Sequence, residues 1–279
     1  MRFSRWLFIG AAVIGALLLF LLFTLWFIPD SELQGLAARA LQQQGYTLRA
    51  ARFGKAFPLG IKAAGVEIAD SRGPLLKAQE MALNLDLLAL LTGKLSLSCR
   101  ATIGSGRFAG EYSPRDNAAA VDIRGVRLDE LPFIETVTGA RAKGVMRLRG
   151  KFTGREKRSS GELQLEVTEA NVAGVKIGEL PLPDADYRRI QGVVRVGNGT
   201  VTLGSFTLEG DGLYVRLRGE FPLTTPQGSA PLNLALELMP KPDFLERQKF
   251  VFLLLTKYLT SPGHYEIPIR GTFSKPAIQ

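Results

Sequence analysis

The chain has 279 residues, a formal net charge of +9 and one cysteine, Cys99. Its 46% of hydrophobic and 22% of charged residues are typical of a folded protein, which excludes extensive disorder. The single cysteine excludes an intramolecular disulfide, so stability must come from buried surface.

The N-terminal segment predicts a membrane anchor. Residues 7–28 (LFIGAAVIGALLLFLLFTLWFI) carry no charge and are long enough to cross about 30 Å of hydrocarbon as a helix. A secretory signal is the alternative, but its apolar part covers about 7–15 residues and ends in a small-x-small cleavage site. Because this run ends in the bulky sequence WFIP, an uncleaved transmembrane helix is favoured.

Charges beside this span predict its orientation. Arg2 and Arg5 precede it, and basic flanks stay on the cytoplasmic side. The expected division is a cytoplasmic tail at 1–6, a transmembrane helix at 7–28 and one non-cytoplasmic domain at 29–279. A basic domain in that place meets anionic headgroups first, so nucleic acid is not an expected partner. A surface biased toward Arg and Lys for solubility explains the charge equally well.

A short amphipathic helix is predicted directly after the span. Apolar residues recur there at helical spacing over residues 33–41. Ser31 and Gln34 match the S-x-x-Q capping box, and Gly45 is a stop signal. We expect a helix over residues 31–44.

Beyond this helix the apolar residues recur with a period of two, which is typical of β-strands. Gly, Asn, Pro and Asp cluster between the alternating runs, as turn residues do. The expected fold class is therefore mainly β and antiparallel. The clearest alternation lies at residues 81–87, 95–103, 163–167, 201–203 and 232–238.

Two later segments interrupt the strands. Residues 128–138 predict a short helix or turn before Gly139. Residues 243–259 predict a second helix that opens with an Asp243 cap. Its apolar run, residues 250–255, is too short to cross a bilayer, so it either packs on the sheet or lies at an interface.

One strand pattern recurs along the chain: apolar-x-apolar-Arg-Gly-x-Phe at residues 146–152, 215–221 and 267–273, and in part at 121–125. Side chains alternate along a strand, so the apolar residues, Gly and Phe share one face and the Arg faces the other way. The Gly suits a bend or bulge. A common solution to sheet curvature explains the pattern without any ligand, and a candidate apolar groove is the alternative. Its expected residues are Met146, Leu148, Phe152, Val215, Leu217, Phe221, Leu234, Ile267, Ile269 and Phe273.

Cations are densest around the first copy of this pattern, where only Glu156 opposes them. Such a patch binds lipid headgroups or an acidic partner, or is the solvated face of a strand and its loop. The candidate basic patch comprises Arg141, Lys143, Arg147, Arg149, Lys151, Arg155, Lys157 and Arg158.

No catalytic, metal or cofactor site is expected. His264 is the only histidine, which excludes a site with two histidine ligands, and a single loop histidine is a weak candidate base. Residues 104–106 (GSG) lack the rest of a phosphate-loop motif and predict a hairpin turn. Asp122 and Glu162 alternate with apolar neighbours, which explains them as solvent-facing strand residues.

The arrangement of these segments resembles AsmA-like proteins. The resemblance lies in the anchor, the short helix, the runs FPLGIKAAGVEIAD (57–70) and GPLLKAQEMALNLDLLALLTGKLSLS (73–98), and the ending IPIRGTFSKP (267–276). Within that superfamily, the length, the block at 128–154 and the late helix are most similar to the GspN family, type II secretion system protein N.

This resemblance implies a Gram-negative inner-membrane protein whose periplasmic domain is a long curved β-sheet with an apolar concave surface. For GspN it implies an accessory, non-enzymatic role in type II protein secretion, with contacts to other secretion proteins. The second interpretation is that the groove holds phospholipid acyl chains, as AsmA-like lipid carriers imply. A purified domain that retains phospholipid would favour the second interpretation.

Overall fold

The computed structural model describes Phe27 and residues 29–155, 158–177, 180–223, 230–272 and 275–278. The predicted transmembrane helix lies outside these residues except for Phe27. Among the residues described, no helix is both long and apolar enough to cross a membrane.

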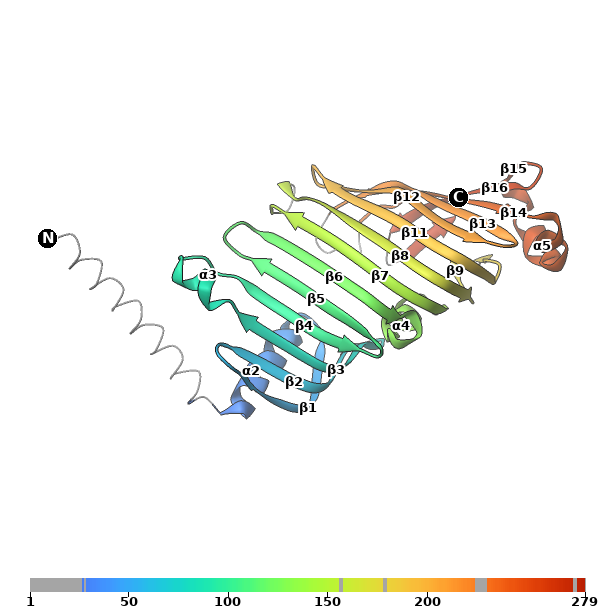
Figure 1. Cartoon of the computed structure of the whole chain (residues 1–279). Helices are drawn as coiled ribbons and strands as arrows, with labels where there is room; N and C mark the ends of the chain where they lie inside the picture. Colours follow the sequence, from blue (N-terminus) through green and yellow to red (C-terminus); the bar gives the residue numbers. More distant parts are fainter. Residues whose placement is uncertain are drawn as a thin grey trace, which may run out of the picture.

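The body of the protein is one open antiparallel sheet of 15 strands (Figure 1). Strands pair in chain order as far as β14, after which β16 lies between β14 and β15, and β17 also pairs with β16. This confirms a mainly β chain with a long antiparallel sheet. In chain order the strands are β1 (Thr47–Ala56), β2 (Gly60–Asp70), β3 (Gly73–Leu85), β4 (Leu97–Ile103), β5 (Gly106–Ser113), β6 (Ala118–Arg127), β7 (Arg141–Thr153), β8 (Ser160–Ala173), β11 (Ala185–Gly197), β12 (Thr200–Gly210), β13 (Leu213–Pro222), β14 (Asn233–Pro240), β15 (Leu259–Ser261), β16 (His264–Thr272) and β17 (Lys275–Ile278), and a separate hairpin contains β9 (Lys176–Ile177) and β10 (Leu180–Pro181).

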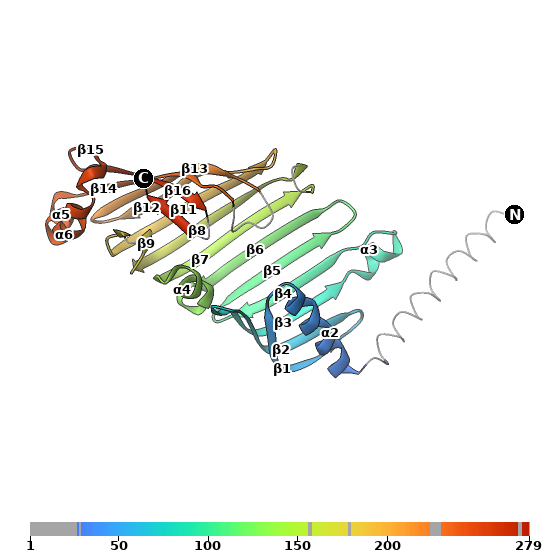
Figure 2. The ribbon, with the colours of Figure 1, turned by 180° about the vertical axis from the view of Figure 1, so that it is seen from behind.

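The described helices are short, and Figure 2 shows α2 over the first strands, α4 beside the end of β7, and α5 and α6 at the far end of the sheet. They are α2 (Asp30–Gln43), α3 (Leu87–Leu91), α4 (Pro132–Thr138), α5 (Pro242–Arg247) and α6 (Lys249–Leu254), with 3-10 turns η1 (Leu128–Glu130) and η4 (Thr256–Tyr258).

The first helix forms where it was predicted, but its capping box does not. Pro29 is the N-cap residue, and its carbonyl accepts hydrogen bonds from the amides of Glu32 and Leu33. Ser31 already lies within the first turn of α2, where its backbone is helical and its side chain cannot cap. The helix ends before Gly45, as expected.

Two other boundaries differ from the sequence prediction. Leu87 starts α3 rather than continuing β3, because the Asp86 carboxylate accepts a hydrogen bond from the Ala89 amide at 3.2 Å and thus caps a helix. The helix predicted at 243–259 is divided into α5, α6 and η4. It begins at Pro242 rather than with an Asp243 cap, since proline suits the first helical position.

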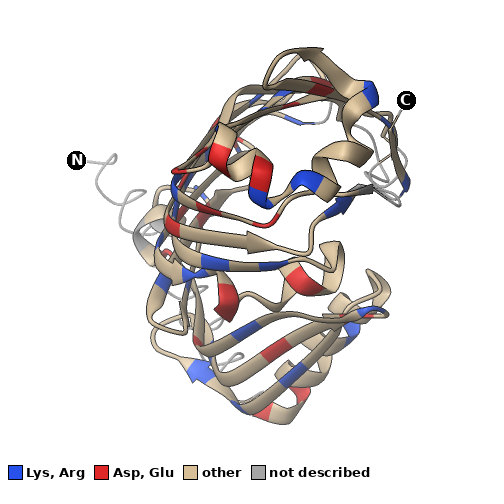
Figure 3. Ribbon diagram, turned by 90° about the vertical axis from the view of Figure 1, so that its right-hand side faces the viewer, with Lys and Arg blue, Asp and Glu red and all other residues tan. Residues whose placement is uncertain are grey.

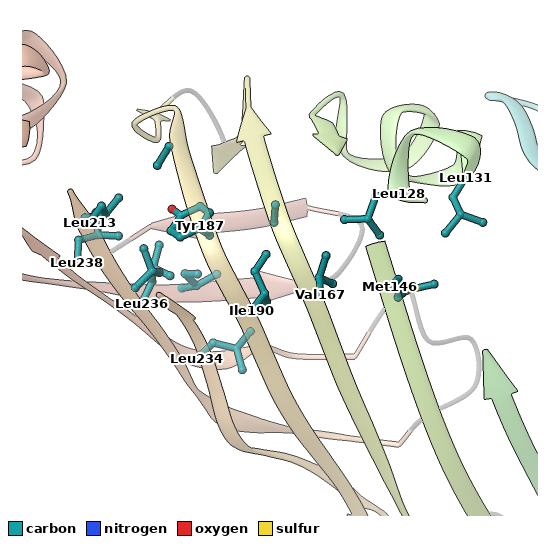
Figure 4. Packing of buried hydrophobic residues seen from close by; sticks show 14 of the residues in the cluster. Leu128, Leu131, Met146, Val167, Tyr187, Ile190, Leu213, Leu234, Leu236 and Leu238 are labelled. Atoms are coloured by element: carbon teal, nitrogen blue, oxygen red, sulfur yellow. The ribbon is translucent and has the colours of Figure 1, made fainter. Parts of the chain in front are cut away.

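The C-terminal half of the sheet curls back on itself, and we call it the closed half although no strand pairing among the described residues joins its edges. β17 lies against β9, so the last strands return toward the connection that follows β8. Figure 3 looks at this end and shows the sheet bent into an arc. The core is concentrated there (Figure 4). Of the five largest fully buried side chains, Leu213, Leu238, Leu255 and Ile267 come from this half, and only Val126 precedes it.

Half of the apolar run at 250–255 belongs to this core. Phe252 is 3% exposed, and its ring centroid lies 6.2 Å from that of Phe244 and 5.1 Å from that of Tyr265. Phe250 and Leu253 point away and are 74% and 66% exposed. The run therefore packs on the sheet through one side of α6 and leaves the other side uncovered.

Candidate functional site: the apolar face

The strand registers align apolar side chains across the whole sheet. A central row begins at Phe53 in β1 and ends at Ile267 in β16. Between β11 and β12, where the register shifts, the Phe206 ring lies over Gly192 and continues the row. Its members, in order, are Phe53, Ala63, Met81, Ala101, Phe108, Ile123, Leu148, Leu165, Gly192, Phe206, Leu217, Leu236 and Ile267.

Two further rows run parallel to the central row, and their members are apolar residues, glycine and Cys99. We call the three rows together the apolar face. The second row contains Ile61, Leu83, Cys99, Gly110, Val121, Gly150, Leu163, Val194, Leu203, Gly219, Leu234 and Ile269. The third contains Leu85, Leu97, Tyr112, Ala119, Phe152, Gly161, Val196, Val201 and Phe221.

Exposure of the apolar face changes along the sheet. In the central row, Met81, Phe108 and Leu148 are half-buried, whereas Leu236 and Ile267 in the closed half are buried. From β1 to β8, the buried members of the three rows are the small residues Ala101 and Gly150. The face is therefore accessible over β1 to β8 and covered near β14 to β16.

A hollow of about 200 Å³ opens in the accessible half. Its lining is apolar apart from one asparagine, and Leu83 within it is 37% exposed. Solvated apolar surface of this kind is more typical of a binding surface than of a core. The lining residues are Leu59, Gly60, Ile61, Leu83, Asn84, Leu85 and Leu97.

The apolar residues of the recurring strand pattern belong to the three rows or, for Met146 and Val215, lie two residues along the strand from a row member. Phe273 is outside the described residues. Met146, Val215, Leu234, Ile267 and Ile269 are buried, and Leu148, Phe152, Leu217 and Phe221 are half-buried.

The glycines of the pattern have different roles. A Cβ atom at Gly150 would approach the Leu163 side chain to 2.6 Å and the Phe152 ring to 3.1 Å, so Gly150 makes room for both side chains. Gly125 adopts a φ of +69° where the register of β6 and β7 shifts, as in a β-bulge. The predicted bend or bulge is therefore confirmed at Gly125. At Gly150 the glycine instead allows neighbouring side chains to pack closely against the strand.

The arginines of the pattern also differ from one another. Arg149 is exposed on the opposite face, as predicted. Arg218 binds Glu237, whose side chain is only 8% exposed, at 2.6 Å, and Glu266 at 2.9 Å. Arg270 differs from Arg149 because it is half-buried and donates to the carbonyl oxygens of Leu234 and Ile269.

The candidate basic patch is part of a mixed-charge face (Figure 3). Arg141, Lys143, Arg147, Arg149 and Lys151 are exposed at alternate positions of β7. Arg155 donates a hydrogen bond to the side chain of Asn117, which lies in the turn between β5 and β6. Arg158 is exposed, and Lys157 lies outside the described residues.

Acidic residues that are distant in sequence flank this patch. Asp122 on β6 lies opposite Arg149, and Glu162 and Glu166 on β8 lie opposite Lys151 and Arg147. Within residues 141–158 the only acidic residue is Glu156, and strand pairing brings Asp122, Glu162 and Glu166 next to the patch. The patch is consequently less basic than the sequence suggests.

Hydrogen bonds from arginines two residues away lower the pKa values of two carboxyl groups, one on β6 and one in η1. The side-chain hydrogen bond from Arg124 lowers the pKa of Asp122, and the bond from Arg127 lowers the pKa of Asp129. Burial raises the pKa of the Cys99 thiol, which disfavours its reactive thiolate form.

The weaker candidates from the sequence have structural roles. Residues 104–106 form the β4–β5 turn, where the Ser105 amide donates to the Glu130 carboxylate at 3.2 Å, so a carboxylate of the chain itself fills the position that a phosphate would need. His264 starts β16, and its carbonyl accepts a hydrogen bond from Thr260. Within the described part of the chain, no three His, Cys, Asp or Glu residues are grouped so as to hold a metal.

Sequence reasoning missed the N-terminal part of the apolar face. Phe53, Met81 and Phe108 belong to strands that lack the Arg-Gly-x-Phe pattern, and only the register reveals that they continue the row. Alternation within each strand could assign these side chains to the apolar side of the sheet. It could not show that they lie opposite one another on neighbouring strands.

These features define a β-sheet scaffold with one continuous apolar face, open at its N-terminal half, and one mixed-charge face. Comparison with known protein families, curated proteins and solved structures finds no match for this chain.

Proposed function

We propose that this protein is a non-enzymatic component of the Gram-negative envelope with a GspN-like accessory role in type II protein secretion. In this proposal residues 7–28 anchor it in the inner membrane and residues 29–279 lie in the periplasm. The observation that carries it is the single open sheet of 15 strands with one apolar face, because the resemblance implied such a sheet after an anchor.

An assembly role fits the charged face and the sheet edge. β1 is the edge strand, and an unpaired edge offers main-chain hydrogen bonds to a partner strand. The mixed-charge face offers complementary ion pairs that select partners without requiring catalysis.

The test is genetic, in a bacterium that carries the chain. Deletion should abolish or reduce release of type II substrates, and the wild-type chain should restore it. A charge reversal of Lys151 with Arg149, both exposed on β7, should impair release if the charged face contacts the machinery. Unchanged release after deletion would contradict the secretion proposal.

Lipid binding is the second candidate, and the three aligned apolar rows favour it. An acyl chain is a long apolar rod, and rows of half-buried side chains such as Phe108 and Leu148 offer a matching surface. Full-length protein extracted in detergent should retain phospholipid, as measured by mass spectrometry after extensive washing. Loss of all lipid, together with normal secretion function, would favour assembly alone.

A further inference from the structure

The mixed-charge face contains a local concentration of arginine that strand pairing creates. Arg107 on β5 lies directly opposite Arg124 on β6, and Arg124 lies directly opposite Arg147 on β7. Neighbouring strands are about 4.8 Å apart, so three guanidinium groups arise from Cα atoms that span about 10 Å. Like charges in directly opposed positions destabilise a sheet, which makes this row unfavourable in the absence of an anion.

The carboxylates nearby pair with Arg124 but leave the other two arginines of this row unneutralised. Asp122 is shared between Arg124 and Arg149, which lies 3.6 Å away. Glu166, opposite Arg147, pairs at 3.4 Å with Arg189 instead. In the described part of the chain, neither Arg107 nor Arg147 is within ion-pair distance of a carboxylate.

The row borders a hollow of about 1090 Å³, which is large enough for an organic ligand. Four arginines and one glutamate line it, so the lining carries a charge of +4 − 1 = +3, and Gln191 adds an amide. The residues used in this argument are Arg107, Arg124, Arg147, Arg149, Glu166 and Gln191.

We propose that this hollow binds a phosphate-bearing ligand through Arg107, Arg124 and Arg147. The guanidinium groups of Arg107 and Arg147 can each donate two parallel hydrogen bonds to phosphate oxygens. Arg124, whose Nε and Nη2 already donate to Asp122, adds a further cation beside them. A doubly charged oxyanion removes the repulsion within the row. Neither the secretion proposal nor the lipid proposal requires this site, whose arginine side chains lie on the opposite face of their strands from the apolar rows. The phosphate belongs either to a soluble compound or to a lipid headgroup.

The test uses the full chain in detergent and isothermal titration calorimetry with two probes, inorganic pyrophosphate and the short-chain lipid dihexanoyl phosphatidic acid. We expect saturable binding of at least one probe. The double variant Arg107→Gln/Arg147→Gln should weaken it about tenfold or more. Lys151→Gln is the matched control, because it removes one exposed charge from the same face of β7 outside the hollow and should change binding less than about twofold.

The outcomes separate the sources of phosphate. Arginine-dependent binding of pyrophosphate alone supports a soluble ligand, and binding of phosphatidic acid alone supports a headgroup. Arg107→Lys/Arg147→Lys keeps the charge but loses the paired hydrogen bonds, so it should bind with intermediate affinity. Absence of saturable binding of both probes up to about 10 mM, or equal weakening by Lys151→Gln, would overturn the proposal. Far-ultraviolet circular dichroism establishes that each variant is folded.

Discussion

At the scale of single residues, the arginines of the recurring strand pattern contribute differently to the stability of the fold. Arg149 is 69% exposed and lies 3.6 Å from a partly exposed Asp122. Arg218 instead neutralises Glu237, the only charged residue that is buried among those described. The contribution of each arginine to the free energy of unfolding therefore depends on how deeply its carboxylate partner is buried. Its position in the recurring strand pattern does not decide it.

This difference predicts the effects of two matched substitutions. Arg218→Gln leaves the Glu237 carboxylate buried without its cation and should lower the free energy of unfolding by about 1–3 kcal/mol. Arg149→Gln should change it by no more than about 0.5 kcal/mol. Urea unfolding of the detergent-solubilised chain measures both. The double variant Arg218→Gln/Glu237→Gln should recover most of the loss, and equal losses for Arg149→Gln and Arg218→Gln would contradict the assignment.

Three carboxyl groups with lowered pKa values predict a loss of stability in acid. Hydrogen bonds from Arg72, Arg124 and Arg127 lower the folded-state pKa values of Asp70, Asp122 and Asp129. A carboxyl group with a lowered pKa stabilises the fold above its unfolded pKa, and this contribution disappears as the pH falls through the folded pKa.

Unfolding midpoints should therefore be constant from about pH 7 to pH 5 and decrease below about pH 4. Asp122→Asn removes one titrating group and should make the decrease shallower. A midpoint that rises below pH 4 would show that other groups dominate.

At the scale of elements, α6 has one packed side and one free side. Phe252 lies between Phe244 and Tyr265, so Phe252→Ala should lower the free energy of unfolding by about 3–5 kcal/mol. Its neighbour Leu253 is 66% exposed, and Leu253→Ala should change stability by no more than about 0.5 kcal/mol. Both substitutions preserve helix propensity well enough for urea unfolding to compare packing alone. A large loss at Leu253 would mean that another surface covers α6.

Much of this element order was predictable because its signals are local. Strand alternation and the short helix before Gly139 depend on neighbouring residues, and both occur where expected. The boundary at Leu87 depends on competition between a strand and the Asp86 cap, which alternation does not reveal. The row through Phe53, Met81 and Phe108 depends on register between strands, which no single segment encodes.

At the scale of the whole molecule, the sheet is closed at one end and open at the other. The two short helical segments predicted from the sequence, 31–44 and 243–259, are too few to cover the apolar face, so part of that face must either curl onto itself or stay open. The curl that brings β17 against β9 provides the missing cover in the C-terminal half. Leu234, which the sequence suggests as an exposed groove residue, is only 8% exposed as a result.

The last prediction tests this division between the halves in living cells. A photo-crosslinking amino acid at Met81 or Phe108 should capture phospholipid or an envelope protein, because the apolar face is accessible there. The same amino acid at Ile267 should capture neither, since that side chain is fully buried. Arg216, exposed on the opposite face of β13, is the control for nonspecific capture.

The pattern of adducts, rather than their presence alone, decides the outcome. Capture at Met81 and Phe108 with none at Arg216 means that the open half binds an apolar partner, and mass spectrometry of the adduct distinguishes lipid from protein. Equal capture at Met81 and Ile267 would mean that the C-terminal half opens in the cell. If Met81 and Phe108 give no adduct, then half-buried apolar rows are sufficiently shielded by one another, and the apolar face serves only to hold the long sheet together.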